Sequence, residues 1–384
     1  MSKYLLVCWF VISLIVFVYS YGFVDFNLTL SSHPLVMNFV SWTQNLAMFH
    51  RSTSLYVYLG LIVLAYLLYS FTLLLTPPKS FPWFFVSLLA LVFSLSYPFL
   101  SSDVFKYLFA AKELIVYHAN PHTVAPWVFE GDTWLRFMRW IHTPSPYGPV
   151  MTALAIPYYI LGFGKFVPTL YLFKLDQIFW YGLSIWVIGK LSKSTRAQLF
   201  FALNPLVLVE WLVNSHNDAP MISLLLFSLY LLSLGKRLPS LVSLLFSIGI
   251  KYVTVFFLPI IFIYKKLSPL FIIHYSLFML ALAPILYNYQ TQFQPWYVTW
   301  LVPLAALSGS VMIMSLTAAY TLGALLRYIP FIQIGLWQGS GRYFALLTFA
   351  PLALTALYFL LLYLFKHYHN PASPTGGSNY SSKR

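Results

Sequence analysis

The sequence has very little charge. Asp, Glu, Lys and Arg make up 8% of its 384 residues and hydrophobic residues make up 60%, whereas charged residues are about 25% of an average soluble domain. The surface of a water-soluble protein cannot be built from so few charges, so a soluble globular fold is excluded. The one cysteine, Cys8, lies inside an apolar run, which excludes a disulfide framework and a cysteine metal site.

Acidic residues are especially scarce, with 8 Asp and Glu against 22 Lys and Arg. In a soluble protein this excess would suggest a nucleic-acid partner. Here the basic residues occupy short gaps between apolar runs, which is typical of cytoplasmic loops in membrane proteins. We therefore expect membrane lipids and no nucleic acid as partners, and both termini in the cytoplasm. The basic gaps contain Lys3, Lys79, Lys190, Lys193, Arg196, Lys236, Arg237, Lys265, Lys266 and Lys366.

Long apolar runs recur along the whole chain. A transmembrane helix needs about 20 mostly apolar residues to cross a hydrocarbon core about 30 Å thick. The runs predict an all-α, polytopic transmembrane bundle of about 11–14 membrane helices, several of them short or broken. The first run continues too far for a signal peptide and is expected to stay as a helix. The clearest spans are 4–23, 54–76, 83–100, 267–287, 311–328 and 343–365.

The chain divides into four parts by composition. Residues 1–100 are expected to form N-terminal transmembrane helices, and 147–366 the transmembrane core. Between them, 101–146 turn polar and aromatic, which predicts a structured loop outside the bilayer after the third span. Residues 367–384 are rich in Ser, Gly and Pro and are expected to be a disordered cytoplasmic tail.

The basic gaps also constrain the topology. If 101–146 lie outside, a helix from Tyr147 should reach the cytoplasm near Lys165, and one further crossing would leave the basic residues at 190–196 outside. We therefore expect 167–189 to enter the membrane and return as a pair of half-spanning helices, with a bend near Asp176.

Residues 240–264 also lie between two basic gaps, so we expect them to enter the membrane and return, with a bend near 249–251. Broken helices are tolerated only where their backbone is buried in protein or lines a wet cavity, so both segments predict a functional cavity. In this topology every carboxylate lies on or near the outer face, namely Asp25, Asp103, Glu113, Glu130, Asp132, Asp176, Glu210 and Asp218.

Two polar motifs interrupt the apolar pattern on that face. Asp103 follows Tyr97-Pro98 and Ser101-Ser102 at the end of the third span. A partly desolvated carboxylate can accept a proton from a hydroxyl nucleophile, although Asp is also a favoured helix N-cap. The second motif runs from Asn214 to Pro220, where Asp218 could carry function or simply cap the following helix.

Two cations are expected at the same outer cavity. Lys251 lies at the second proposed bend and Arg342 precedes the final span. Both could bind a lipid phosphate, although Arg342 could equally snorkel to headgroups. His118 and His122 are separated by Asn120-Pro121, which argues against one helical face and so against a metal pair. We expect no cofactor and no tightly held divalent metal.

The motifs, taken in order, resemble those of GT-C glycosyltransferases, in particular polyprenyl-phosphate-mannose-dependent α-1,6-mannosyltransferases. The resemblance spans most of the chain from about Tyr97 onward. It is carried by Tyr97-Pro98, Ser102-Asp103, Tyr107, Asn120-Pro121, Tyr147-Gly148-Pro149, Asn204-Pro205, His216-Asn217-Asp218-Ala219, Lys251-Tyr252, Pro295-Trp296-Tyr297 and Arg342-Tyr343.

The resemblance implies a hexosyltransferase that moves a sugar, mannose first of all, from a polyprenyl-phosphate donor to a hydroxyl of a glycan or glycolipid acceptor. The transfer would invert the anomeric centre on the non-cytoplasmic face of the cell membrane. Asp103 resembles the family's catalytic base. The residues expected to bind substrate are Lys251, Arg342, His216, Asn217, Asp218, Tyr107, Asn120, Tyr147, Trp296 and Tyr297.

Broken helices with ionisable residues also occur in transporters, so a membrane transporter or lipid-linked-glycan flippase is the alternative. Transporters usually contain an inverted internal repeat, and the sequence shows no convincing one. The ionisable residues also sit at the outer boundary, where a one-sided enzyme needs them. An inactive structural subunit of a membrane complex is a third reading of the same sequence.

Overall fold

The structure is a computed structural model that describes residues 3–25, 28, 30–75, 79–288, 293–336 and 341–369. Within these ranges the regular elements are all helical, which confirms the all-α class. Residues 370–384 of the expected tail lie outside the described residues, and 367–369 still belong to the last helix.

The helices follow one another with short connections. The first half of the chain contains α1 (Lys3–Ser20), η1 (Tyr21–Phe23), α2 (Pro34–Ala47), α3 (Arg51–Leu74), α4 (Trp83–Leu95), α5 (Asp103–Ile115), η2 (Pro126–Val128), η3 (Thr133–Phe137), α6 (Pro149–Leu161) and α7 (Phe166–Ser192). The second half contains α8 (Thr195–Ala202), α9 (Pro205–Val207), η4 (Leu208–Val213), α10 (Asp218–Ser233), α11 (Arg237–Ile250), η5 (Tyr252–Phe257), α12 (Leu258–Ile263), η6 (Tyr264–Lys266), α13 (Pro269–Asn288), η7 (Pro295–Trp300), α14 (Leu301–Ser308), α15 (Val311–Leu326), α16 (Ile329–Ile334) and α17 (Gly341–His369).

Four helical segments are long and apolar enough to cross a membrane, or up to five if the bent pair Thr195–Ala202 and Pro205–Val213 counts as one. The four are Lys3–Phe23, Arg51–Leu74, Val311–Ile334 and Gly341–Lys366, which matches four of the predicted spans. The runs at 83–100 and 267–287 form α4, with 13 residues, and α13; α4 and the segment Pro269–Pro284 of α13 are among the shorter apolar helices. At 1.5 Å per residue, α4 is about 20 Å long and covers only part of a bilayer.

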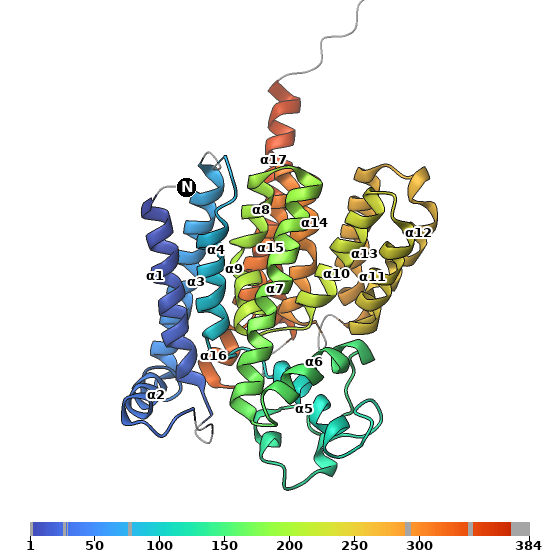
Figure 1. Cartoon of the computed structure of the whole chain (residues 1–384). Helices are drawn as coiled ribbons and strands as arrows, with labels where there is room; N and C mark the ends of the chain where they lie inside the picture. Colours follow the sequence, from blue (N-terminus) through green and yellow to red (C-terminus); the bar gives the residue numbers. More distant parts are fainter. Residues whose placement is uncertain are drawn as a thin grey trace, which may run out of the picture.

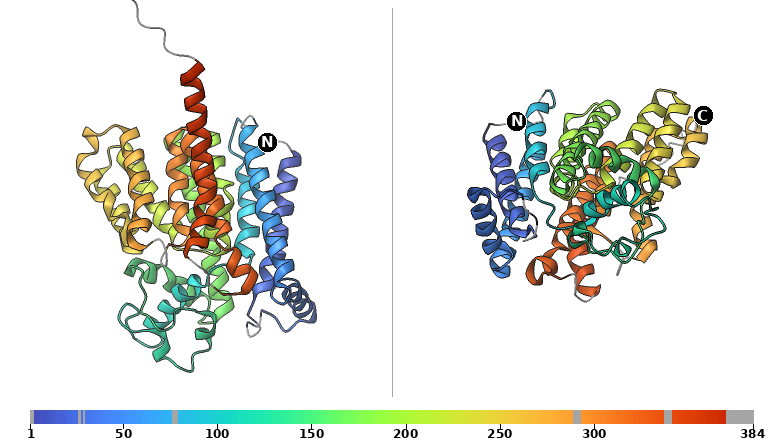
Figure 2. Two further views of the ribbon diagram at one scale, coloured as in Figure 1. Left: turned by 180° about the vertical axis from the view of Figure 1, so that it is seen from behind. Right: turned by 60° about the horizontal axis from the view of Figure 1, so that its bottom comes forward.

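The helices lie side by side in a bundle with two distinct ends (Figure 1). The start of α1 and the end of α17 lie at one end, together with the connection from α12 to α13, whereas α5, α6 and the loop between them lie at the other. The view from behind shows the same separation (Figure 2, left). The basic residues Lys265 and Lys266 in η6 are therefore remote from the start of α5.

The expected bend near Asp176 is wrong. α7 is one continuous helix of 27 residues, and Asp176 lies within it, where its carboxylate accepts a hydrogen bond from Trp180 Nε1 at 2.6 Å. Trp180 is one helical turn along, so the carboxylate is satisfied without any break in the helix. α7 therefore runs as a single element from the loop end of the bundle to the opposite end (Figure 1).

The expected crossing from Tyr147 to Lys165 is also wrong. α6 has 13 residues, which makes it about 20 Å long, and it lies beside α5 at the loop end of the bundle (Figure 1). The start of α7 is at that end too, because the Phe166 ring stacks on Phe137 of the loop at 4.3 Å. The basic residues at 190–196 reach the opposite end by way of α7 alone, so no second crossing is needed.

The predicted break at 249–251 is confirmed. α11 ends at Ile250, and the chain continues as the short helices η5 and α12. The break lies against the start of α6, where the Gly148 amide donates to the Ile250 carbonyl at 2.9 Å. A Cβ on Gly148 would lie 2.1 Å from the Gly249 carbonyl oxygen, so glycine alone permits this contact between backbones.

Gly148→Ala should therefore separate α6 from the end of α11 and lower the thermal unfolding temperature in detergent. Overpacking of this kind costs about 1–3 kcal/mol. Gly131→Ala is the control, because nothing lies within 4 Å of the added Cβ at that position. Equal unfolding temperatures for the two variants would contradict the contact.

Candidate active site

The polar stretch at 214–217 follows an irregular helix. Asn204 caps α9, its Oδ1 accepting from the amides of Leu206 and Val207 at 3.1 and 3.3 Å, and η4 then continues as a π-helix. Ser215 has a φ of 58°, an uncommon left-handed conformation for a residue with a side chain. Strained backbone of this kind concentrates at functional sites.

A buried lysine holds this turn in place. Lys174 of α7 is fully buried and its ammonium donates to the Leu212 carbonyl at 2.9 Å, to the Val213 carbonyl, and to Ser215 Oγ at 3.1 Å. Those two carbonyls come from the last residues of η4, where carbonyls lack partners within the helix. Lys174 therefore compensates for the end of the π-helix, a role that the sequence did not indicate.

Asp103 lies in the first turn of α5 and is 7% exposed. The cap position belongs to Ser102, and no side-chain hydrogen bond caps the helix there. The Asp103 carboxylate instead faces other elements: its Oδ2 accepts from Tyr147 Oη at 2.9 Å and lies 3.8 Å from His216 Nδ1. The capping alternative for Asp103 therefore does not hold.

Asp218 occupies the matching position on α10 and is also not a side-chain cap. Its Oδ1 accepts from Lys251 Nζ at 2.8 Å and from Trp300 Nε1. The Lys251 ammonium also lies over the rings of Tyr297 and Trp300, at 4.9 and 5.3 Å from their centroids. The break after α11 thus brings a cation to a buried carboxylate and two aromatic faces.

Tyr107 joins the two carboxylate groups into one cluster. Its hydroxyl lies 3.5 Å from the Asn217 amide nitrogen of the main chain, and its ring packs edge-on against Tyr147 at 4.8 Å. The Trp296 ring stacks on His216 with centroids 4.0 Å apart. The cluster therefore draws on α5, the start of α6, α10, the end of α11 and η7.

Several buried polar atoms in the cluster have no hydrogen-bond partner in the protein. Among the described residues, these atoms without a hydrogen-bond partner include both side-chain amide atoms of Asn217, both ring nitrogens of His216 and Oδ2 of Asp218. All three residues are fully buried. Because an unpaired buried polar group costs about 1–3 kcal/mol, such atoms require an explanation, and a polar ligand supplies one.

Glu210 belongs to the cluster although the sequence analysis did not include it among the site residues. It is fully buried in η4 and accepts from Tyr328 Oη and Asn214 Nδ2, both at 2.8 Å. Its Oε2 also lies 3.3 Å from His216 Nε2. The one sequence signal was a glutamate inside an apolar run, where ionisable residues are expensive.

Two expected site residues lie apart from these contacts. Asn120 is exposed in the loop, and its Oδ1 accepts from the His122 amide at 3.0 Å, which is a turn-forming interaction. Arg342 is exposed in the first turn of α17.

The loop supplies two further cations. Lys106 is 4% exposed and donates to the carbonyls of Trp140 and Thr143 at 2.9 and 2.8 Å, which fastens the loop to α5. Burial lowers the pKa of Lys106 to about 8. Arg139 is exposed and its guanidinium lies over the Phe331 ring of α16 at 4.6 Å. Sequence reasoning missed Arg139 because nothing local distinguishes it from other basic residues of the loop.

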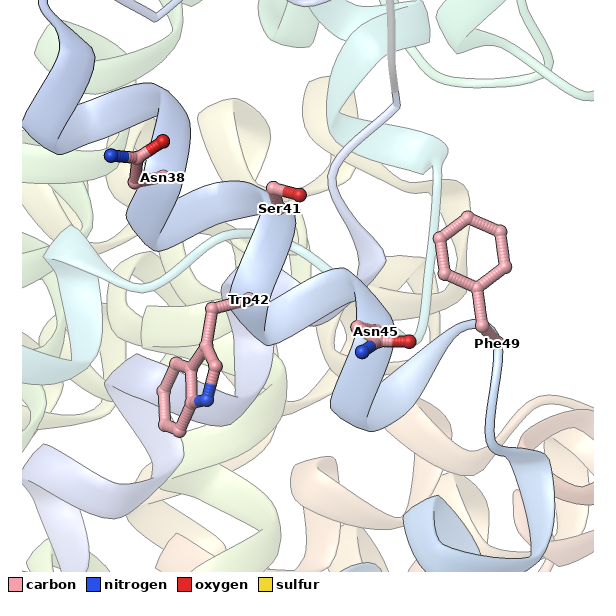
Figure 3. A pocket seen from close by; sticks show the side chains of 5 residues that line it. All are labelled: Asn38, Ser41, Trp42, Asn45 and Phe49. Atoms are coloured by element: carbon pink, nitrogen blue, oxygen red, sulfur yellow. The ribbon is translucent and has the colours of Figure 1, made fainter.

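A shallow pocket on α2 is separate from the cluster. It is lined by Asn38, Ser41, Trp42, Asn45 and Phe49, all from α2 and the residues just after it (Figure 3). In the described part of the chain, no group of three or more His, Cys, Asp and Glu is arranged to hold a metal ion.

The fold and the cluster together define a polytopic helical membrane protein with buried ionisable groups gathered at one end of its bundle. The family described as alpha-(1->6)-mannopyranosyltransferase, N-terminal domain, matches residues 9–265, which is more than half of the chain. The chain therefore belongs to this family of glycosyltransferases, and the expectation of a hexosyltransferase of the GT-C type is confirmed. No curated protein and no solved structure gives a significant match.

Glu113 gives the loop end of the molecule a testable pH dependence. It lies on α5, 2% exposed, and burial raises its pKa from 4.5 to about 7, although Lys106 opposes the shift. Because the pKa of Glu113 is higher in the folded than in the unfolded state, protonated Glu113 favours the folded state. This contribution to stability is complete below about pH 4.5 and is lost as the pH rises through about 7.

Glu113→Gln should therefore flatten the decrease in thermal unfolding temperature between pH 5 and pH 8. The measurement compares the unfolding temperatures at pH 5 and at pH 8, in detergent, for the wild type and for the variant. Glu130→Gln is the matched control, because Glu130 is exposed in the loop that follows α5. A Glu113→Gln protein with the pH dependence of the wild type would disprove the buried titration.

Proposed function

We propose that the protein transfers a sugar, mannose in the first instance, from a polyprenyl-phosphate donor to a hydroxyl of a glycan or glycolipid. In this proposal Asp103 is the general base and the anomeric centre is inverted. The observation that carries it is the position of Asp103: a nearly buried carboxylate held by Tyr147 on one oxygen, next to buried polar atoms without partners, in a chain of the mannosyltransferase family.

The proposed reaction balances without a metal. The acceptor oxygen bonds to the anomeric carbon, the bond from that carbon to the phosphate oxygen breaks, and its electron pair leaves with the phosphate. The acceptor proton passes to Asp103. Tyr147 and His216 both face Oδ2 of Asp103, so Oδ1 is the oxygen that we assign to the proton transfer.

The unpartnered atoms of Asn217 and Asp218 suit a sugar. A sugar hydroxyl both donates and accepts hydrogen bonds, as the Asn217 amide does, whereas an ionised Asp218 Oδ2 accepts only. Trp296 and Tyr297 add aromatic surface beside them. We therefore assign the donor sugar to Asn217 and Asp218, on the side of Asp103.

The phosphate of the donor needs a cation as the leaving group gains charge. Lys251 is the assigned residue, because its ammonium lies at the break after α11 and its side chain is 17% exposed. Stabilising charge that develops in the transition state contributes directly to rate. Arg342 remains a second proposed phosphate contact, and Arg139 near the start of α5 is added from the structure.

The proposal includes the side of the membrane on which the candidate site lies. The end of α7 with Lys190, the start of α11 with Arg237 and η6 with Lys265 lie away from α5 (Figure 1). Because short cytoplasmic loops carry an excess of Lys and Arg, we assign that end to the cytoplasm and the candidate site to the opposite face. The lipid donor would then enter sideways from the outer leaflet.

Asp103→Asn should reduce transfer of labelled mannose from polyprenyl-phosphate-mannose to membrane acceptors by about 10²–10⁴-fold in kcat, because the amide cannot accept the proton. The assay uses purified protein, and Glu130→Gln serves as the charge-loss control. Full activity in Asp103→Asn would exclude Asp103 as the base. Solute flux without any consumption of lipid-linked sugar would favour a transporter instead.

Lys251→Gln should raise the KM for the lipid donor by about 10- to 100-fold, the range expected when a hydrogen bond to a charged group is lost. The change also leaves Asp218 without its ion pair, so Lys251→Gln combined with Asp218→Asn is measured beside it. Lys265→Gln at the opposite end is the control. An unchanged donor KM in both Lys251 variants would remove Lys251 from the phosphate site.

A further inference from the structure

Three ionisable side chains form a row behind the candidate site. Glu210 Oε2 lies 3.3 Å from His216 Nε2, and His216 Nδ1 lies 3.8 Å from Asp103 Oδ2. Glu210 and His216 are fully buried, whereas Asp103 is at the edge, with 10% of its side chain exposed. Only Asp103 is therefore placed to meet a substrate, and the other two lie behind it.

The hydrogen bonds around Glu210 favour its ionised form. Tyr328 Oη donates to Oε1 and Asn214 Nδ2 donates to Oε2. The orientation of the Asn214 amide is fixed by its other end, since its Oδ1 accepts from the Leu100 amide at 3.3 Å. Hydrogen bonds donated to a carboxylate stabilise its charge, so these two donors suit an ionised Glu210 in its buried position.

A buried negative charge needs a positive partner. Of the other cations nearby, Lys174 binds the carbonyls of η4, Lys251 binds Asp218 and Lys106 binds the loop carbonyls. Arg139 lies over the Phe331 ring. His216 is the basic side chain that contacts Glu210, and its ring also stacks on Trp296. Aromatic faces attract cations, which adds to the preference for a charged imidazole.

The two nitrogens of His216 each face a carboxylate. A neutral imidazole carries one N–H, so one of its nitrogens would present a lone pair to a carboxylate oxygen. The doubly protonated ring carries an N–H on each nitrogen, and both nitrogens lie within ion-pair distance of a carboxylate, although neither makes a hydrogen bond. The distance of 3.8 Å to Asp103 is within the range of an ion pair but longer than a hydrogen bond, so this contact can adjust when substrate binds.

We propose that Glu210 is a positioning residue that keeps His216 doubly protonated and directed at Asp103, and that this dyad holds Asp103 as a carboxylate ready to accept the acceptor proton. The inference rests on the proposed function, because it assigns a reason for the charge state of the base. Glu210 touches no reacting atom. Other ionisable groups that face the row are Tyr58, Tyr107, Tyr147, Tyr328, Lys106, Arg139 and Asp218.

The first arm of the test reads the protonation of His216 without any activity assay. Protein with ¹⁵N-labelled histidine is studied by NMR at pH 7.5, and the His216 signals are assigned as those lost in His216→Gln. The wild type should give the signals of a doubly protonated ring and Glu210→Gln those of a neutral one. A neutral ring in the wild type overturns the proposal.

The second arm measures transfer of mannose from polyprenyl-phosphate-mannose over a range of pH. Glu210→Gln should lower kcat by about 10- to 100-fold, as removal of an orienting partner does, with donor KM changed less than about threefold, and should move the acid limb of the kcat profile to higher pH. Tyr328→Phe keeps the charge of Glu210 and should shift the limb less. If Glu210→Gln does not fold, Tyr328→Phe is measured in its place.

The outcomes separate the two ideas. A Glu210→Gln protein with the kcat and pH profile of the wild type, measured where Asp103→Asn is inactive, overturns the dyad and leaves the proposed function standing. A wild type that transfers no sugar but shows a doubly protonated His216 dependent on Glu210 supports the dyad and removes the proposed function. Glu130→Gln, with its exposed carboxylate, should match the wild type in both arms.

Discussion

The candidate site depends on the hydrogen bonds that Lys174 donates to the end of η4. A chain inside an apolar bundle can leave the helical conformation only where its freed carbonyls find new donors. Lys174 supplies these for Leu212 and Val213, and it also binds Ser215, whose left-handed backbone turns the chain back. Because of this turn, His216 faces Glu210 of the same segment and the following residues open α10 toward the site.

The two acids nearest the site owe their position to helix ends. Asp103 and Asp218 both lie in the first turn of a helix, where the partial positive charge of the helix terminus favours a carboxylate. Their side chains are nevertheless directed at Tyr147 and Lys251 from other elements. Helix termini therefore gather negative charge at one end of the bundle, and the break after α11 brings a positive charge to meet it.

The sequence predicted some breaks in the helices and not others, for physical reasons. Lys251 marks the end of α11 because a charge within an apolar stretch needs a polar partner, and that partner is Asp218. The same reasoning failed for Asp176, since Trp180 one turn along satisfies its carboxylate within an intact helix. The basic gaps at 165 and 190–196 require a second crossing only if α6 crosses the membrane, but α6 is short and packs beside α5. Counting membrane crossings from the basic gaps cannot reveal a helix that stays at one end of the bundle.

By itself, the sequence determined the membrane class, because 8% charged residues cannot cover a soluble surface, and it determined the ordered motifs that identify the glycosyltransferase family. Only the tertiary structure brought Tyr328 to Glu210 and Asp103 to His216. These side chains lie up to 118 residues apart and carry no shared local pattern. Their pairing is enforced by the cost of burying an unpaired charge, which acts only once the helices have packed.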